Sequence, residues 1–456
     1  MEASLTNLSS LLFEHPSGDT EPLVHTIAET RTAGEVRTDA RRVAEVLEIA
    51  PGDAVAIGLP NGPDLLGAMF GVWLAGGVLV PMNPRQTPVE LSAFIEAVKP
   101  AAIVTASGIE RRQSTTHADD VALITFTSGT TGQPKPIMHT HAGYLELLDR
   151  VLAPLKGDTS ERAPQTRKPS ANLIPVSMAL NAGIYNTLFG LRAGAPLVIM
   201  EQFDPTVCAE LVRRFQIRST VLPPAAIAAL TDSEVSDLTP LKYVRSITAS
   251  LSPLQARRFQ QKFSTFVLNS YGQAEIGEVI GWTSADARDF PAKIGAVGRP
   301  HAGVDIRFDT DGCLLVRPPT IALGLDGRTD DDGYVNTGDI AILDEDGFVW
   351  IEGRQTDLIN RGGNKIFPDA VEEVLLLHPN VFDVAVVATP DERLGEVPVA
   401  VIVGDKVDDE MLVAHCREYL TPYKVPVSFA WVESLPRNAA GKLLRKEIAA
   451  SLTSDA

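Results

Sequence analysis

The sequence predicts an α/β protein with more than one domain. Its 456 residues exceed the size at which a single hydrophobic core usually stops growing. In the first third, segments with helical spacing of apolar residues alternate with short apolar runs typical of buried strands. From about residue 303 to 353, short alternating strands are separated by Asp-Gly turns. We expect a large N-terminal domain of mixed and parallel sheets with flanking helices, a β-rich subdomain, and a small α+β C-terminal domain.

The first third supplies the elements of a mostly parallel sheet, because strands that alternate with helices usually lie parallel. Thr38 or Asp39 is expected to cap the first helix, since both side chains can accept a hydrogen bond from the first turn. The uncharged run Leu65–Met82 is interrupted by Gly76-Gly77 and Pro81, which favours a buried helix and a strand over a membrane span. The other expected elements are a helix at 63–75, a helix at 88–98, and strands at 54–57, 78–80 and 101–105.

The rest of the chain continues in the same style. Residues 153–170 carry Pro, Gly, Ser and charges and predict an exposed loop. We place the domain boundary at the hinge near Gln355, which gives domains of 1–355 and 356–456. Strands are expected at 121–127, 197–200, 220–222, 381–389 and 397–403, and helices at 208–215, 253–263, 369–377 and 410–419.

Composition excludes several classes of protein. The formal net charge of −18 argues against nucleic acid or an anionic membrane as a partner, because both need clustered Lys and Arg. The three cysteines are far apart and lack metal-ligand spacing, so neither a disulfide framework nor a zinc site is expected. The N-terminus lacks the basic and apolar regions of a signal peptide, and a cytoplasmic location is the default expectation.

The stretch Thr127–Lys135 has the composition of a phosphate-binding loop. Its hydroxyls, backbone amides and two glycines can wrap closely around phosphate oxygens, and Lys135 adds a positive charge. It is not the loop of P-loop NTPases, because Gly129, Gly132 and Lys135 are spaced three apart. Taken alone, such a loop is more often a plain turn.

Four further motifs follow in order, and together with the loop they resemble the adenylate-forming superfamily. This superfamily includes acyl-CoA synthetases, peptide-synthetase adenylation domains and luciferases, and the resemblance covers about residues 40–450. A lone Thr-Gly-Asp is usually a turn and a lone C-terminal Lys is usually a solvated charge, so specificity comes from the five motifs coinciding. The four are Asn269–Glu275, Asn336–Asp339, Gly353–Ile359 and Pro436–Lys442.

The resemblance implies an adenylate site for ATP and Mg²⁺. Glu275 and Thr130 are expected to hold Mg²⁺ and to act in catalysis, and Lys442 to bridge the carboxylate of the substrate and the α-phosphate. Tyr271 is expected to stack on adenine, and Asp339 to accept hydrogen bonds from the ribose, with Arg354 nearby. The other expected nucleotide-binding residues are Thr127, Ser128, Gly129, Thr131, Gly132, Lys135, Asn269, Ser270, Gly272, Gln273 and Ala274.

The resemblance also implies an acyl pocket and a hinge. Small side chains at Thr248, Ala249 and Ser250, with Met178 and Ala179 opposite, leave room for a bulky hydrophobic acid; they equally fit tight backbone packing. In the family, a mobile C-terminal domain swings about the hinge, so that a glycine loop comes near a thiol tunnel for coenzyme A. The expected hinge and tunnel residues are Thr356, Asp357, Arg361, Gly362 and Gly363.

Four residues depart from the family pattern. Pro136 follows the loop lysine, Ala274 replaces a threonine, Thr356 replaces an Asp or Lys, and Met178 stands at the usual aromatic or His gate. The region between Thr105 and Val121 is also short. Because two of the departures lie where ATP reacts, a ligase that only consumes preformed acyl-adenylate is an alternative to full two-step ligation.

Two more functions are compatible with the same motifs. A stand-alone adenylation enzyme could load a carrier protein in trans, and a catalytically inactive nucleotide-binding protein would retain the motifs without turnover. His139-Thr140-His141 has i,i+2 spacing and no further ligands, so a surface or packing role is expected rather than a metal pair. A homodimer is one assembly state left open. We therefore expect a small-molecule carboxylic acid or its acyl-adenylate, ATP and coenzyme A as partners, and an AMP-forming acid–thiol ligase.

Overall fold

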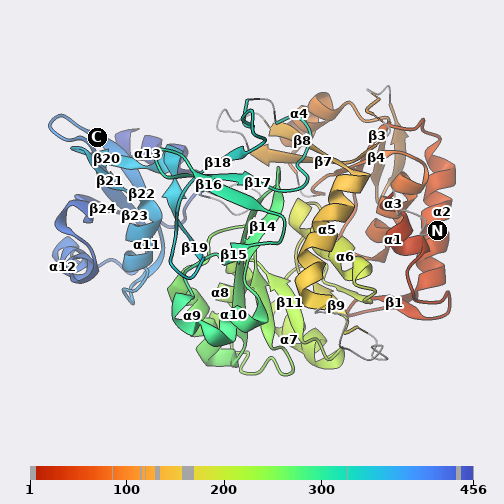
Figure 1. The fold of residues 1–456 in the computed structure, drawn as a ribbon, viewed down its shortest axis with the longest axis horizontal. Coiled ribbons are helices and arrows are strands. Elements are labelled where there is room, and N and C mark those ends of the chain that lie inside the picture. The colour runs from red at the N-terminus through yellow and green to blue at the C-terminus, as the bar shows by residue number, and fades with distance from the viewer. Residues whose placement is uncertain are drawn as a thin grey trace.

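The structure is a computed structural model that describes residues 7–84, 86–112, 116–118, 120–128, 134–156, 169–325, 327–437 and 443–454. The chain forms a large N-terminal part and a smaller C-terminal part that projects from it at the left of Figure 1. The large part contains three parallel or mixed sheets with helices around them, and a fourth, antiparallel sheet lies on the side toward the C-terminal part. The predicted fold class is confirmed.

A six-stranded sheet contains the strands that flank the predicted phosphate loop. Its order is β6-β5-β3-β4-β7-β8; the four central strands run parallel and each edge strand runs antiparallel to its neighbour. The short region after Thr105 is occupied in part by the edge strand β6, which forms a hairpin with β5. The strands are β3 (Ala54–Gly58), β4 (Val78–Pro81), β5 (Ala102–Thr105), β6 (Gly108–Arg111), β7 (Val121–Ser128) and β8 (Pro134–Thr140).

The first long helix begins earlier than expected. Helix α2 spans Ala33–Leu47 and is capped by Thr32, whose side chain accepts from the amide of Glu35 while Glu35 accepts from the amide of Thr32. This reciprocal capping box satisfies two amides that a helix start otherwise leaves unpaired. The prediction of Thr38 or Asp39 as the cap was wrong: Thr38 lies inside the helix, and its hydroxyl donates to the carbonyl of Gly34, one turn earlier.

Helices cover this sheet and fix its core. Helix α3 (Pro63–Leu74) is buried over most of its length, so the uncharged run forms the expected helix and strand. Trp73 is fully buried, and its indole N–H donates to the carbonyl of Ala122 on β7. The other helices of this region are α1 (Ser10–Phe13), α4 (Pro88–Val98) and α5 (His141–Lys156); α5 occupies the start of the predicted loop 153–170, of which residues 157–168 lie outside the described part.

Two further sheets complete the large part. One has the order β2-β1-β10-β9, and the other has the order β11-β12-β13-β14-β15, in which the first three strands are parallel. The strands are β1 (Pro22–His25), β2 (Thr30–Thr32), β9 (Asn172–Ile174), β10 (Leu197–Ile199), β11 (Ser219–Leu222), β12 (Tyr243–Ser246), β13 (Phe266–Gln273), β14 (Gly277–Gly281) and β15 (Arg299–Pro300). The helices are α6 (Asn181–Arg192), α7 (Pro205–Arg214), α8 (Pro224–Asp232), α9 (Pro253–Phe263), α10 (Ser284–Asp289) and the 3₁₀ turn η1 (Pro291–Lys293).

The predicted hairpin-rich region is an antiparallel four-stranded sheet. Asp311-Gly312 connects its first two strands and Asp346-Gly347 its last two, and both glycines have the positive φ that these turns need. The strands are β16 (Asp305–Phe308), β17 (Cys313–Arg317), β18 (Val335–Leu343) and β19 (Val349–Arg354). The 3₁₀ turn η2 (Gln355–Asp357) follows directly and leads into the C-terminal part.

The C-terminal part has its own sheet and core. A long hairpin of β22 and β23 forms its centre, and the core includes Ile359, Val371 and Ile402. The strands are β20 (Ile359–Arg361), β21 (Asn364–Ile366), β22 (Val381–Asp391), β23 (Gly395–Gly404) and β24 (Ser428–Trp431), and the helical elements are α11 (Pro368–Leu375), α12 (Asp409–Tyr419), η3 (Pro422–Lys424) and α13 (Arg445–Ser454).

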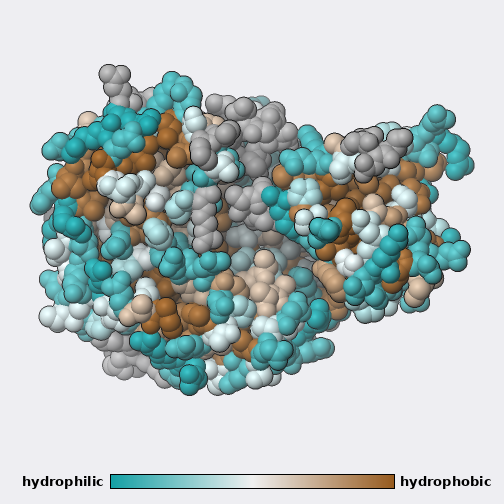
Figure 2. Space-filling view, turned by 180° about the vertical axis from the view of Figure 1, so that it is seen from behind, coloured by the Kyte–Doolittle hydropathy of each residue, from teal (hydrophilic) through white to brown (hydrophobic). Residues whose placement is uncertain are grey.

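The surface seen from behind is mostly hydrophilic, with separate hydrophobic patches over both parts of the molecule (Figure 2). Among the described residues, no helix combines the length and apolar character needed to cross a bilayer.

Candidate active site

Asp339 is the point at which three of the five motifs meet. Its carboxylate is nearly buried and accepts from the hydroxyl of Tyr271 at 2.5 Å and from the amide nitrogen of Gln273 at 2.9 Å. The other carboxylate oxygen lies 2.9 Å from Nε of Arg354. Burial, together with the charge of Asp339, raises the pKa of the Tyr271 phenol well above its ordinary value, so Tyr271 stays a donor.

The backbone at Asp339 is shaped by the two residues before it. Gly338 has a φ of +73°, a left-handed conformation that glycine adopts without strain. The hydroxyl of Thr337 donates to the carbonyl of Leu314 on β17 and accepts from the amide of Asp339. Asp339 also stands opposite Arg354 in the β18–β19 pairing, so the sheet brings the two motifs together.

Glu275 lies close by and is held by Arg328. Its carboxylate is 2.5 Å from Nη1 of Arg328, whose other terminal nitrogen donates to the side chain of Gln273 at 2.9 Å and to the carbonyl of Asn336 at 3.0 Å. Arg328 therefore connects the motif at 269–275 to the motif at 336–339. No motif marked this arginine, and the only sequence signal was a basic residue in an otherwise acidic turn.

The remaining residues of the 269–275 motif lie along one strand and its turn. Gly272 is required by close approach, because a Cβ there would lie 2.1 Å from the carbonyl oxygen of Gly277. Ser270 donates to the carbonyl of Ser246 at the end of β12, and Asn269 lies beside Ser246 in the sheet register. Ala274 lies in the turn between β13 and β14, next to Glu275.

Two predicted parts of the site fall outside the described residues. These are Gly129, Thr130, Thr131 and Gly132 of the phosphate loop, together with Lys442; the side chains of Thr127, Ser128 and Lys135 are likewise not described. The flanking strands β7 and β8 pair with each other, with Thr127 opposite Lys135. Pro136 lies on β8, an edge strand, where the missing amide of a proline is tolerated.

The predicted hinge is a short 3₁₀ turn between the two sheets. Thr356 donates to Asp357 at 3.0 Å, and Asp357 forms an ion pair with Arg445 at 3.4 Å. Arg445 also pairs with Asp369 at 2.7 Å and with Glu372, so it ties the hinge to helix α11. Arg445 comes three residues after Lys442, just beyond the last motif, and was not predicted from the sequence.

The predicted glycine loop is the turn of the β20–β21 hairpin. Gly362 and Gly363 both have positive φ. Arg361 donates to the carbonyl of Tyr423 at 2.7 Å, so its side chain is bound within the C-terminal part.

The predicted acyl-pocket residues differ in exposure. Met178 is buried, and its amide donates to the side chain of Asn61, whereas Thr248, Ala249 and Ser250 are exposed. Thr248 has a φ of +81°, an unusual conformation for a β-branched residue. Among the described residues, no hydrogen bond or salt bridge joins Met178 to this segment, so the pocket remains a prediction.

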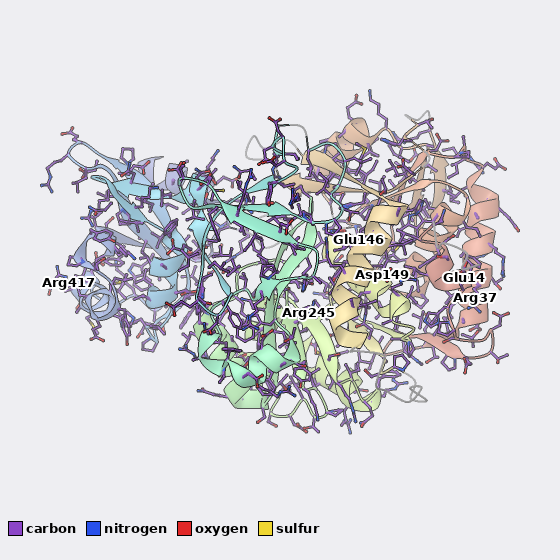
Figure 3. All side chains as sticks on the ribbon, in the orientation of Figure 1. Glu14, Arg37, Glu146, Asp149, Arg245 and Arg417 are labelled. Atoms are coloured by element: carbon purple, nitrogen blue, oxygen red, sulfur yellow. The ribbon has the colours of Figure 1, made fainter. Side chains whose placement is uncertain are left out.

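A buried ion pair lies between the strands of this region. Glu278 on β14 accepts from Nη1 of Arg245 on β12 at 2.5 Å, from Tyr185 on α6 at 3.3 Å, and lies 3.1 Å from Nε2 of His301. Burial alone would raise the pKa of Glu278, but the charge of Arg245 and these hydrogen bonds leave it below its ordinary value. Arg245 lies on β12, while Glu146 and Asp149 lie along α5 (Figure 3).

Replacing Arg245 by Met is expected to destabilise the protein by about 3–5 kcal/mol, because it leaves the charge of Glu278 buried without its partner. Chemical denaturation of wild type and variant measures the loss. The control is Arg258→Met, which breaks an exposed pair with Asp232 and should cost less than about 1 kcal/mol. Equal losses in the two variants would contradict a structural role for the buried pair.

The histidines at 139 and 141 are packing residues. Both are buried, and desolvation lowers the pKa of each to about 4, so they are neutral near pH 7. The ring of His139 packs edge-on against Tyr144, and Nδ1 of His141 accepts from the amide of Leu8. Within the described residues no cluster of three or more His, Cys, Asp or Glu could hold a metal ion.

The carboxylate of Glu275 fits Mg²⁺ only when the ion arrives together with a nucleotide. Mg²⁺ is commonly bound through one or two carboxylates together with substrate phosphates. Glu275 offers one such carboxylate, and a nucleotide bound at Asp339 would bring its phosphates into the same region. Fold and site thus define a two-part nucleotide-binding enzyme with a small C-terminal sheet next to the site.

Comparison with known proteins gives the family. The model of the AMP-binding enzyme family matches residues 15–117 and 108–324, and the model of its C-terminal domain matches residues 370–442. The chain belongs to the AMP-binding enzyme family. The predicted superfamily and the predicted enzyme class, AMP-forming acid–thiol ligase, are both confirmed.

Relatives agree with this assignment over nearly the whole chain. A 4-coumarate–CoA ligase of Humulus lupulus is 28% identical over 94% of this chain and 90% of its own length. A 3-[(3aS,4S,7aS)-7a-methyl-1,5-dioxo-octahydro-1H-inden-4-yl]propanoyl:CoA ligase of Rhodococcus jostii is 30% identical, covering 87% of this chain and 88% of its own. ATP-bound MatB from Rhodopseudomonas palustris has the same fold, with a TM-score of 0.86, 23% identity and 99% coverage of both chains.

Proposed function

We propose that this protein is an acyl-CoA ligase that activates a carboxylic acid as acyl-AMP and transfers the acyl group to coenzyme A. The observation that carries the proposal is the convergence of Tyr271, Gln273 and Arg354 on the buried carboxylate of Asp339. A buried carboxylate held within a strand is a suitable acceptor for a pair of ribose hydroxyls. In this proposal Glu275, which Arg328 links to Gln273, faces the phosphates.

In the first half-reaction, an oxygen of the acid attacks the α-phosphorus of ATP and the bond to pyrophosphate breaks. Negative charge grows on the leaving pyrophosphate, so cationic and donor groups around it lower the barrier. In our proposal Thr130, Lys135 and the loop amides contact those phosphates. Bound Mg²⁺, held by Glu275, would supply further charge neutralisation. Lys442 holds the attacking carboxylate against the α-phosphate.

In the second half-reaction, the thiol of coenzyme A attacks the acyl carbon and AMP leaves. We infer a rotation of residues 356–456 against residues 1–355 about Thr356 and Asp357, so that Lys442 leaves the site and the turn at Arg361, Gly362 and Gly363 approaches it. Hinge rotations about a few residues are a known way to complete two sites in turn. The ion pair between Asp357 and Arg445 has to follow this rotation.

For the acid, we propose a bulky hydrophobic substrate. Support comes from the small side chains at Thr248, Ala249 and Ser250. It also comes from the relatives that act on 4-coumarate and on a bicyclic propanoate. Met178 and Ala179 would close the opposite side of the pocket.

The second candidate is a ligase that lacks the first half-reaction. Ala274 carries no hydroxyl next to Glu275, which favours this alternative, whereas Pro136 lies on an edge strand, where the missing amide of a proline is tolerated. Such an enzyme would convert preformed acyl-AMP to acyl-CoA but would not release pyrophosphate from ATP.

Two parallel assays with a panel of aromatic and alicyclic acids test the proposal. One measures pyrophosphate release from ATP and acid, and the other measures acyl-CoA formed from synthetic acyl-AMP. We expect activity in both. Activity only in the second assay establishes the ligase that lacks adenylation, and activity only in the first, with transfer to a carrier protein, points to carrier loading. Nucleotide binding without either activity would contradict the proposal.

A further inference from the structure

Arg328 holds a position in the site that the motifs do not explain. Its guanidinium reaches Glu275, Gln273 and the backbone of Asn336, which belong to two motifs on either side of the site. The residue stands 53 positions from Glu275 in the chain, so the contact exists only in the folded protein. Its side chain remains 36% exposed, which leaves it accessible to a ligand.

The backbone around Arg328 fixes where the guanidinium lies. Its amide donates to the carbonyl of Leu325, and its carbonyl accepts from the amide of Asn336. The next residue, Thr329, pairs with Val335 in an isolated bridge. Arg328 and Thr329 are thus both held against the start of β18, the strand that carries Asp339.

We propose that Arg328 binds the β- and γ-phosphates of ATP and stabilises the pyrophosphate that leaves. This inference rests on the proposed adenylation, in which Glu275 turns to the metal that accompanies the phosphates. Once Glu275 does so, Nη1 of Arg328 loses its carboxylate partner beside the phosphates, while Nη2 stays bound to Gln273 and Asn336. A guanidinium suits this role because its planar donors match phosphate oxygens.

The charge balance of the site supports this assignment. Without nucleotide, each of the two carboxylates is paired with its own arginine: Glu275 with Arg328, and Asp339 with Arg354. With the nucleotide and its metal present, Arg328 becomes an additional positive charge at the leaving group.

Binding measurements with two nucleotides separate this role from a structural one. Calorimetry compares MgATP with AMP, which lacks the β- and γ-phosphates, for wild type and for Arg328→Met, Arg328→Lys and the exposed control Arg258→Met. We expect Arg328→Met to weaken MgATP binding roughly tenfold, as for loss of one charge-assisted hydrogen bond, with AMP binding unchanged. Arg328→Lys should recover part of the loss, and Arg258→Met should match wild type.

The reverse reaction gives a second readout. Arg328→Met should slow pyrophosphate-dependent formation of ATP from acyl-AMP, while transfer from acyl-AMP to coenzyme A stays at the wild-type rate. If Arg328→Met weakens the binding of MgATP and of AMP equally, or changes neither, the proposed role of Arg328 is wrong, while the proposed function still stands. If wild-type protein binds neither nucleotide, the proposed function fails and the role of Arg328 fails with it.

Discussion

Replacing Lys442 by Ala is expected to lower pyrophosphate release from ATP and acid by about 10²–10³-fold, the size typical of losing one group that stabilises transition-state charge. Two anionic groups, the carboxylate and the α-phosphate, must approach each other in this step. A lysine between them offsets their repulsion. Formation of acyl-CoA from synthetic acyl-AMP should change little, because the carboxylate has already reacted.

The matched control for this prediction is Lys446→Ala, which removes an exposed lysine from helix α13 near the same part of the chain. It should leave both half-reactions at wild-type rates. A loss of similar size in both half-reactions for Lys442→Ala would show that Lys442 does not act specifically in adenylation.

Replacing Asp339 by Ala should impair both half-reactions. The carboxylate is the common acceptor for Tyr271, Gln273 and Arg354, and in our account it also accepts from the ribose, which ATP and acyl-AMP share. Hydrogen bonds to charged groups contribute about 1.5–3 kcal/mol each, so we expect AMP and ATP to bind roughly 10- to 100-fold more weakly. Calorimetry with AMP measures this without turnover.

Asp311→Ala is the control for Asp339→Ala, because Asp311 is an exposed acid in a turn of the same sheet. Thermal unfolding of both variants separates lost binding from lost folding. If Asp339→Ala bound AMP as tightly as wild type, the ribose assignment would be wrong. The two variants should therefore differ: Lys442→Ala affects only adenylation, and Asp339→Ala affects both half-reactions.

Much of the fold follows from local sequence signals. Helix α9 begins at Pro253 and ends at Phe263 as predicted, because Ser252 caps it and Pro253 is favoured in a first turn. The start of α2 was missed because Thr38 and Asp39 were taken as the cap candidates, whereas the capping pair Thr32 and Glu35 lies earlier in the chain. In the structure Glu35 completes the box with Thr32, while the hydroxyl of Thr38 bonds within the helix.

The candidate site was predictable only where a motif marks it. Tyr271, Asp339 and Arg354 belong to three separate motifs, and the structure brings them together on β13, β18 and β19. Arg328 and Arg445 were missed because each acts through partners distant in the chain. Such contacts depend on sheet pairing and helix packing that periodicity does not specify. The hydrogen bond from Tyr271 to Asp339 was not predicted either, because the family resemblance implied only that Tyr271 stacks on adenine.

The central claim is that the acid is activated as an adenylate, and isotope transfer tests it most directly. The enzyme would be supplied with ATP, coenzyme A and an acid whose carboxylate carries ¹⁸O at both oxygens. In our account one carboxylate oxygen joins the α-phosphate and leaves with AMP when the thiol attacks, so mass spectrometry should find one ¹⁸O in each AMP formed. Acyl-CoA formed with unlabelled AMP, or with ¹⁸O in inorganic phosphate and ADP as coproduct, would contradict the account.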